Sequence, residues 1–251
     1  MRERYQFALR IAHLAGHNTL QYFRKDFTVI TKDDDSPVTD ADRTSEELLR
    51  AEIEQHYPDD GIIGEEFGEK KGSSDFTWVL DPIDGTKSFV RGFPGYGNLV
   101  GMLENGEPTI GVINCPALGE MVSAYRGGGC FLNGRPCRVS QTAAISRATV
   151  CSSDFRDVAR TWGPQTLLNI WESCGLPRSW GDCYGYLLLA TGRIDIMIDP
   201  ELKIWDLAAL IPVILEAGGR ITDLDGKTSV YNTSCVATNG IIHPDVLRVL
   251  R

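Results

Sequence analysis

Several signals that would place the chain in a familiar functional class are missing. The four histidines form no His-Glu-x-x-His motif, and no two cysteines are spaced as Cys-x-x-Cys. The seven cysteines are scattered along the chain, at positions 115, 130, 137, 151, 174, 183 and 235. An odd, scattered set fits reduced thiols better than a disulfide framework, and the missing motifs argue against a zinc hydrolase.

Long apolar runs and excess positive charge are also missing. No stretch approaches the apolar length of a membrane span, and residues 1–20 lack the continuous apolar segment of a signal peptide. The formal net charge is −9, whereas a general nucleic-acid binder needs basic surface. These absences predict a cytoplasmic protein with neither a membrane nor a nucleic acid as partner.

The composition that remains is ordinary for a globular protein, with 42% hydrophobic and 24% charged residues. A chain of 251 residues can bury a sizeable core as one large domain or as two halves. We predict an α+β half over residues 1–140 that carries most of the candidate ligands. An α/β half over residues 141–251 would complete the site.

Local patterns predict which segments are helices and which are strands. Apolar residues at helical spacing predict helices over 4–23 and 41–56, separated by a strand at 27–31 and a polar loop at 32–37. Alternating segments follow, with a hairpin turn at Asn105-Gly106. Beyond residue 145, helices over 165–175, 183–192 and 203–219 alternate with short strands. The pattern indicates layered α/β structure, with a largely antiparallel first sheet and a mixed second one.

Acidic residues recur where these apolar elements end or begin. Glu65 follows the strand segment GIIG, Asp81 and Asp84 follow TWVL, and Asp206 stands at the start of the last long helix. Carboxylates gathered at one edge would repel each other without a cation, and hard oxygen ligands suit Mg²⁺. Each acid also has a plainer explanation: a turn for Asp84-Gly85, a solvated loop for Glu65, and a helix N-cap for Asp206.

The hexapeptide DPIDGT, residues 81–86, combines two kinds of ligand chemistry. Pro82 stiffens the segment and so fixes how the two aspartates are presented. Gly85 allows close approach of the backbone, and the N–H groups of Gly85 and Thr86 could face a phosphate at a helix start. One short segment could therefore bind both a metal and a phosphate.

Three motifs together resemble those of the inositol monophosphatase family. They are GEE (64–66), WVLDPIDGT (78–86) and WDLAALIPVILEAGG (205–219), supported by PVTDAD (37–42) and ATGRIDIMID (190–199). The resemblance covers nearly the whole chain. It implies an αβαβα sandwich, a homodimer, and a lithium-sensitive phosphatase that depends on two or three Mg²⁺ ions.

The resemblance also implies a role for each matching residue. Glu65, Asp81 and the Ile83 carbonyl would ligate a first metal. Asp81, Asp84 and Asp206 would hold a second, and Asp42 would contribute to a third through water. Thr86, with Gly85, would bind phosphate oxygens and, with Glu65, would orient the attacking water. Hydrolysis would then proceed by metal-activated water without a covalent intermediate.

The identity of the phosphate ester depends on the residues around the leaving group. Lys87 after Thr86 resembles both the histidinol-phosphatase and the nucleotide-phosphatase branches of the family, whereas WGDCYGY at 180–186 resembles the histidinol-phosphate phosphatase branch. Histidinol phosphate carries an amine and an imidazole, so carboxylates should line its pocket. Asp182 and Asp199 match the leaving-group positions, and Tyr184 could pack near the imidazole. The plainer reading makes Asp182 an N-cap.

Other functions stay open at this point. An inositol 1-phosphatase is the second choice, because Asp199 could equally bind vicinal hydroxyl groups. A 3′-phosphoadenosine 5′-phosphate phosphatase would need basic residues, of which Lys87 and Arg91 are the candidates. A metal-binding regulator without catalysis is a further alternative, but such a protein should have lost a ligand, and none is missing.

Overall fold

The computed structural model describes residues 1–25, 29–31 and 37–251. Residues 26–28 and 32–36, on which part of the expected strand at 27–31 and most of the loop at 32–37 fall, lie outside the described residues. Strand β1 (Val29–Thr31), which lies between these two segments, pairs antiparallel with β2 (Pro37–Thr39), which follows the second.

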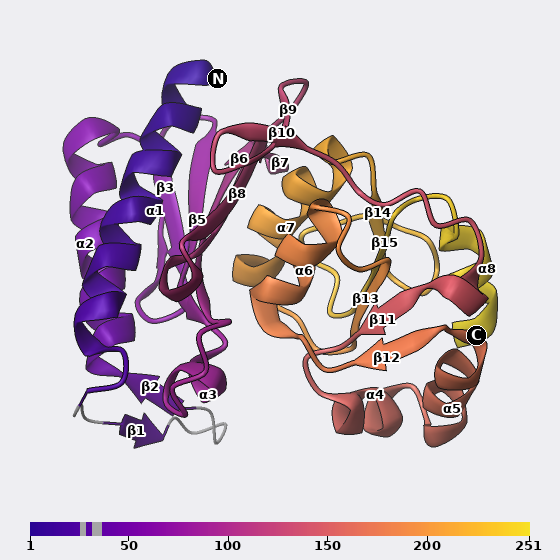
Figure 1. The fold of residues 1–251 in the computed structure, drawn as a ribbon. Helices are drawn as coiled ribbons and strands as arrows, with labels where there is room; N and C mark the ends of the chain where they lie inside the picture. Colours follow the sequence, from indigo (N-terminus) through magenta and orange to yellow (C-terminus); the bar gives the residue numbers. More distant parts are fainter. Residues whose placement is uncertain (26–28, 32–36) are drawn as a thin grey trace.

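The described elements stack in five layers, helices alternating with sheets (Figure 1). Two long N-terminal helices cover one face of the larger sheet, and two further helices lie between that sheet and the smaller one. Helices of the C-terminal half cover the outer face of the smaller sheet. The αβαβα sandwich expected from the sequence is confirmed.

The larger sheet joins eight of the described strands in the order β10-β9-β8-β7-β6-β5-β3-β4. Neighbouring strands are antiparallel except β3 and β5, which run parallel. The strand bounds are β3 (Gly61–Gly64), β4 (Gly68–Lys70), β5 (Phe76–Asp84), β6 (Gly97–Glu104), β7 (Glu107–Cys115), β8 (Glu120–Tyr125), β9 (Gly129–Leu132) and β10 (Arg135–Cys137). The expected antiparallel character is therefore present, with one parallel pair where the site residues lie.

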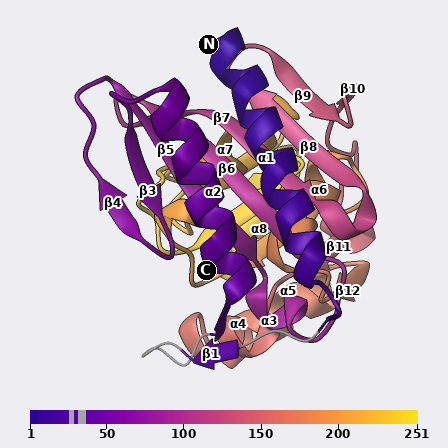
Figure 2. The ribbon, with the colours of Figure 1, turned by 90° about the vertical axis from the view of Figure 1, so that its left-hand side faces the viewer.

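Helices α1 (Arg2–Tyr22) and α2 (Asp40–His56) lie side by side across the outer face of this sheet (Figure 2). Their apolar faces bury Ile11, Leu49 and Ile53 against the strands, as the helical spacing predicts. Trp78 of β5 is completely buried beneath them, and its indole N–H donates to the Asp60 carboxylate at 2.9 Å. This layer fixes α2 over β5, the strand that carries the two candidate aspartates.

The smaller sheet joins five described strands in the order β12-β11-β13-β15-β14 and mixes parallel with antiparallel pairs, as expected. Its strands are β11 (Thr149–Cys151), β12 (Leu176–Arg178), β13 (Ile196–Asp199), β14 (Arg220–Thr222) and β15 (Cys235–Thr238). The helices on its outer face are α4 (Phe155–Thr161), α5 (Pro164–Ser173) and α8 (His243–Leu250). Helices α4 and α8 have no counterpart among the elements predicted from the sequence.

Helices α6 (Asp182–Ala190) and α7 (Ile204–Glu216) form the middle layer. Gly101 of β6 and Gly111 of β7 are cross-strand partners, and α7 packs directly on them. A Cβ at Gly111 would lie 2.1 Å from the Ala209 oxygen, and one at Gly101 would lie 2.8 Å from Ala208 Cβ. Glycine is therefore required at both positions, because only a bare backbone lets α7 come this close.

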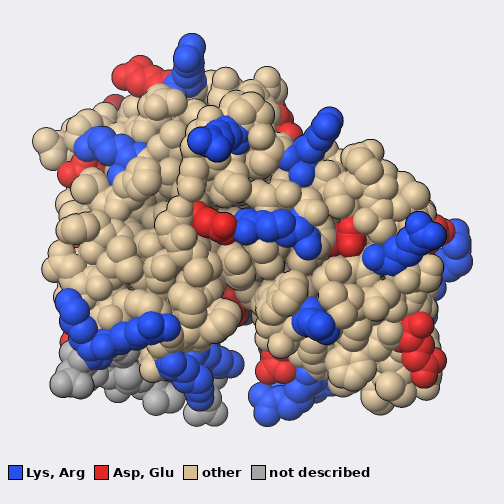
Figure 3. Space-filling view, viewed as in Figure 1, with Lys and Arg blue, Asp and Glu red and all other residues tan. Residues whose placement is uncertain are grey.

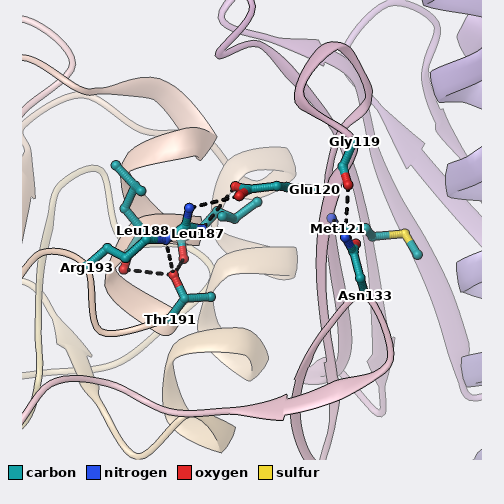
Figure 4. A network of polar contacts seen from close by, with 8 residues as sticks. All are labelled: Gly119, Glu120, Met121, Asn133, Leu187, Leu188, Thr191 and Arg193. Atoms are coloured by element: carbon teal, nitrogen blue, oxygen red, sulfur yellow. Dashed lines mark hydrogen bonds and ion pairs between the residues drawn. The ribbon is translucent and has the colours of Figure 1, made fainter.

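Polar contacts also fasten the middle layer to the larger sheet. Arg193, just after α6, forms two hydrogen bonds of 2.9 and 3.0 Å with Glu120 at the start of β8 (Figure 4). Within α6, the Thr191 hydroxyl donates to the Leu187 and Leu188 carbonyls at the end of the helix. Within the larger sheet, the Asn133 side chain accepts the Met121 N–H and donates to the Gly119 carbonyl. The ion pair is partly exposed, so it contributes little to the free energy of folding.

Smaller elements complete the chain. They are helix α3 (Thr86–Phe89) and two short 3-10 helices, η1 (Pro116–Leu118) and η2 (Ile145–Arg147). The hairpin between β6 and β7 turns at Asn105 and Gly106, whose φ values of 54° and 82° are those the Asn-Gly pair predicts. None of the helices in the described part of the chain combines the length and apolar character that a membrane crossing requires.

Candidate metal centre and active site

The two aspartates of DPIDGT lie at the end of β5, where the strand contains a bulge. Asp81 pairs with Leu99, but Asp84 pairs with Gly97, so β5 has one residue more than its partner across this interval. Residues three apart on a regular strand point to opposite faces, and the extra residue brings both carboxylates to the same cluster. The turn that the sequence predicts at Asp84-Gly85 begins at Gly85. Pro82 lies before it, in the bulge, a position that tolerates a missing N–H donor.

Asp206 reaches the same point from the first turn of α7. Each of the three aspartates, Asp81, Asp84 and Asp206, offers one carboxylate oxygen to the cluster. These three oxygen atoms all lie within 4.8 Å of one another, a spacing that suits one bound cation. Asp206 also accepts a hydrogen bond of 2.7 Å from the Lys203 N–H. Lys203 is the N-cap residue, so Asp206 is not the N-cap, but it closes the first turn while contributing to the cluster.

The cluster is electrostatically unfavourable in the absence of a cation. Burial, reinforced by Glu65, Asp84 and Asp206, raises the pKa of Asp81 well above its usual range. Burial also raises the pKa of Asp206 to about 7. Among the described residues, Asp81 Oδ1 is a buried side-chain oxygen with no hydrogen-bond partner. An orphaned carboxylate oxygen among mutually repelling acids fits a divalent cation, which would satisfy it and offset the repulsion.

Asp84 is held by the N-terminus of α6. The Cys183 N–H, in the first turn of that helix, donates to the Asp84 carboxylate. Burial, followed by the charges of Asp182 and Asp206, raises the pKa of Asp84 well above its usual range. The helix end therefore orients the carboxylate and supplies partial positive charge to it.

Glu65, Asp42, Thr86 and Ile83 surround this cluster. Glu65 follows β3, next to β5, and its charge contributes to the raised pKa of Asp81 and Asp42. Thr86 Oγ1 lies 2.9 Å from the Ile83 carbonyl and 3.3 Å from Asp42 Oδ1. The structure thus brings the predicted ligands into one region, while their individual roles stay predictions.

Asp42 is engaged within its own helix as well. Its Oδ2 accepts hydrogen bonds from the Thr39 N–H at 2.7 Å and the Thr39 hydroxyl at 2.6 Å. Burial raises the pKa of Asp42 to about 6, although the bonds from Thr39 oppose the increase. One carboxylate oxygen therefore caps α2, and the other faces Thr86.

Gly85 is needed for both its conformation and its space. Its φ is 81°, in the left-handed region, and it is the N-cap of α3. A Cβ on it would lie 2.8 Å from Asp182 Oδ2. The N–H groups of Ser88 and Phe89 already donate to the Gly85 carbonyl, so the predicted phosphate contacts would fall to the N–H groups of Gly85 and Thr86.

Asp84 and Asp206 face a small cavity of about 150 Å³. Besides these two, its lining consists of Ser153, Asp154, Asp157, Asp182, Asp199, Pro200, Glu201 and Leu202. Asp182 accepts a hydrogen bond of 2.7 Å from Ser88 in α3, and its own N–H donates to Ser153 Oγ at 2.8 Å. Asp182 is the first residue of α6, after the N-cap Gly181, and its carboxylate joins α6 to α3.

Asp199, the last residue of β13, is buried in the wall of the same cavity. It accepts hydrogen bonds from the Ser153 N–H at 2.9 Å and the Tyr186 hydroxyl at 2.8 Å. Burial raises the pKa of Asp199 to about 7, against the lowering effect of these bonds. These two hydrogen bonds join β13 to α6 and to the segment after β11. A contact between Asp199 and the substrate stays a prediction.

The other two predicted substrate residues, Lys87 and Tyr184, do not line the acidic cavity. Lys87 is exposed on α3, and its positive charge opposes the rise in the pKa of Asp182. Tyr184 lines an apolar cavity of about 440 Å³, together with Phe93 and Trp180, and does not line the acidic cavity. Its expected contact with an imidazole stays untested.

Sequence reasoning missed several residues of the acidic cavity. Asp154 follows the strand segment ATVCSS, so the rule that found Glu65 and Asp81, an acid directly after a strand, could have found it. Ser88, which donates to Asp182, gave no signal, and Tyr186, which donates to Asp199, entered only as part of the motif WGDCYGY. Hydroxyl groups on short helices have many plainer roles.

A five-layered α/β fold that gathers carboxylates from two sheets and from the first turns of α2, α6 and α7 defines an enzyme class that handles anionic substrates through divalent cations. The sequence pattern of the inositol monophosphatase family matches residues 1–251. The chain belongs to this family and is a phosphoric monoester hydrolase.

Individual relatives agree with this assignment. A histidinol-phosphatase of Chlorobaculum parvum is 44% identical over 228 residues, covering 90% of this chain and 88% of that protein. A histidinol-phosphatase of Mycobacterium tuberculosis is 41% identical over 249 residues, covering 96% and 95%. Among solved structures, an IMPase of Thermotoga maritima superposes with a TM-score of 0.91 at 30% identity, covering 99% of this chain and 96% of that one.

Proposed function

We propose that this phosphatase hydrolyses histidinol phosphate to histidinol and phosphate, the dephosphorylation that histidine biosynthesis requires, with Mg²⁺ as its metal. The observation that carries the proposal is the acidic cavity beside the metal cluster, where Asp182 adjoins Asp84. A leaving group with an amine and an imidazole needs carboxylates around it. Relatives that are 41–44% identical and bear the name histidinol-phosphatase support the same choice.

The chain's own residues would prepare the phosphate for attack. A divalent cation held by Asp81, Asp84 and Asp206, with Glu65 and the Ile83 carbonyl nearby, would act as a Lewis acid and make a nucleophilic water available. The N–H groups of Gly85 and Thr86 would donate to phosphate oxygens. Thr86 and Glu65 would orient the water, and Asp42 would contribute to a further, weaker cation site. The proposal includes two or three Mg²⁺ ions in each active site and inhibition of the enzyme by Li⁺.

The surface around the site suits a phosphate dianion despite the acidic net charge. Lys and Arg side chains lie on both sides of the notch at the lower edge of the molecule, between α3 and α4, with acidic side chains beside them (Figure 3). Lys87 lies exposed on α3. Positive charge at such a rim attracts anionic substrate, while the acids inside the cavity would receive the cationic leaving group.

Phosphate release should discriminate strongly among three esters. With Mg²⁺ saturating, kcat/KM for L-histidinol phosphate should exceed those for inositol 1-phosphate and 3′-phosphoadenosine 5′-phosphate by about a hundredfold, or roughly 2.7 kcal/mol of transition-state stabilisation. Asp182→Asn should lower kcat/KM for histidinol phosphate about tenfold more than for inositol 1-phosphate. Asp225→Asn, an exposed aspartate, is the matched control.

A preference for inositol 1-phosphate would replace histidinol phosphate by the less favoured alternative. Equal losses for both esters in Asp182→Asn would reduce Asp182 to the link between α3 and α6 seen in the structure. No release from any ester would favour a catalytically inactive regulator.

We also propose a homodimer, with a second copy of the chain covering the apolar cavity beside α6. Phe93, Leu118 and Trp180 expose 45%, 37% and 41% of their surface around it. Large apolar side chains gathered in one place are typical of an interface. Light scattering after size exclusion should give twice the 27.7 kDa chain mass, and Trp180→Glu should shift the protein toward a monomer. A monomeric wild type would refute the dimer.

A further inference from the structure

Glu46 is a completely buried carboxylate that none of the proposed metal or phosphate contacts uses. It lies on α2, one helical turn after Asp42. Its Oε2 accepts the Glu66 N–H at 2.8 Å, and its Oε1 accepts the Phe67 N–H at 3.2 Å. Arg50, one turn further along α2, donates to Oε1 at 2.8 Å. A buried charge is retained only when it is fully engaged in this way.

These contacts fix the backbone on both sides of Glu65. The Glu65 N–H donates to the Leu80 carbonyl of β5 at 3.2 Å, and the next N–H along the chain, that of Glu66, donates to Glu46. The carboxylate also lies directly against Gly64, where a Cβ would be 2.0 Å from Oε1. Arg50 holds the same loop further along the chain, because its guanidinium group donates to the Gly68 carbonyl.

We propose that Glu46 is a positioning residue for the metal centre: by holding the loop after β3, it sets the direction in which Glu65 presents its carboxylate. The inference rests on the proposed metal-dependent function. Ligand carboxylates must be held to within about 0.5 Å of their working geometry, and groups one shell removed achieve this. Without Glu46, two backbone donors lose their acceptor, and the loop between β3 and β4 can adopt other conformations.

The test compares Glu46→Gln with Glu47→Gln, an exposed neighbour on the same helix. Glutamine has nearly the same volume, but its amide group replaces one of two oxygens that face N–H donors, so it cannot satisfy all three. The affinity for Mn²⁺, measured from free Mn²⁺ by electron paramagnetic resonance, should fall about tenfold in Glu46→Gln. The Mg²⁺ concentration for half-maximal phosphate release should rise by a similar factor, with kcat at saturating Mg²⁺ within about threefold of wild type. Glu47→Gln should match wild type in each measurement.

The outcomes separate this inference from the function on which it rests. A Glu46→Gln protein with a lowered melting temperature but unchanged Mn²⁺ affinity would show that Glu46 only stabilises the fold. A wild type that neither binds Mn²⁺ nor releases phosphate would refute the proposed function instead. If Glu46→Gln yields no folded protein, Arg50→Gln keeps the carboxylate and removes its cation. It should weaken Mn²⁺ binding about threefold, and unchanged affinity would overturn the inference.

Discussion

Asp84→Asn should abolish Mg²⁺-dependent phosphate release while the fold stays intact. Asparagine has nearly the same volume, and its amide oxygen can still accept the Cys183 N–H that holds Asp84 in place. The amide group, however, puts an N–H donor where the cluster with Asp81 and Asp206 offers a carboxylate oxygen. Removal of a direct ligand should cost more than the 10- to 100-fold typical of outer-shell groups, so kcat/KM should fall by at least about a hundredfold.

Stability should respond in the opposite sense to activity. Burial and neighbouring acids raise the pKa of Asp84, so its ionised form is unfavourable in the metal-free protein. Asp84→Asn should therefore leave the metal-free melting temperature unchanged or slightly higher. Near-UV circular dichroism would verify the native packing. Near-normal release by a natively folded Asp84→Asn would refute the metal role of Asp84, whereas the exposed Asp225→Asn should behave as wild type.

Mg²⁺ binding should weaken steeply as the pH falls below 7. The pKa of Asp206 is raised to about 7, and those of Asp81 and Asp84 are also raised, chiefly by burial. A cation must displace the protons that these groups carry at lower pH. Affinity should therefore fall about tenfold per pH unit for each proton displaced. Titration calorimetry at pH 6 and pH 8, in buffers of different ionisation enthalpy, would measure both the affinity and the protons released.

The metal-free protein should show the reverse trend in stability. The ordinary pKa of Asp206 is 3.8, and the folded value is about 7, so between these limits the folded state holds a proton that the unfolded state has lost. Its contribution to folding therefore declines as the pH rises from about 4 to above 7. The melting temperature without metal should be lower at pH 8 than at pH 6, and Mg²⁺ should restore more of it at pH 8.

Lithium provides an independent control on the same site. At constant ionic strength, LiCl should lower Mg²⁺-dependent phosphate release, whereas KCl should not.

Two outcomes would contradict these predictions. Mg²⁺ affinity that is equal at pH 6 and pH 8 would contradict the idea that Asp81, Asp84 and Asp206 bind the ion. Indifference to Li⁺ would leave the fold assignment unchanged but would contradict the proposed arrangement of the cations.

The sequence by itself determined which groups could take part in the chemistry and the order in which they occur. Periodicity identified the helices that became α1, α2 and α7, and the Asn105-Gly106 pair identified a hairpin, because these signals depend only on neighbouring residues. Acids at the ends of strands marked Glu65, Asp81 and Asp84 for the same reason. The resemblance of the motifs added the family and the assignment of each residue.

Only the tertiary structure decided how these groups meet. The bulge that turns Asp81 and Asp84 to one side appears only in the pairing of β5 with β6, and Asp206 reaches them because α7 rests on the paired glycines 101 and 111. The hydrogen bonds from Ser88 to Asp182 and from Glu66 to Glu46 join residues 94 and 20 positions apart. Such contacts depend on how the helices and strands pack against each other, and this packing cannot be predicted from patterns among neighbouring residues.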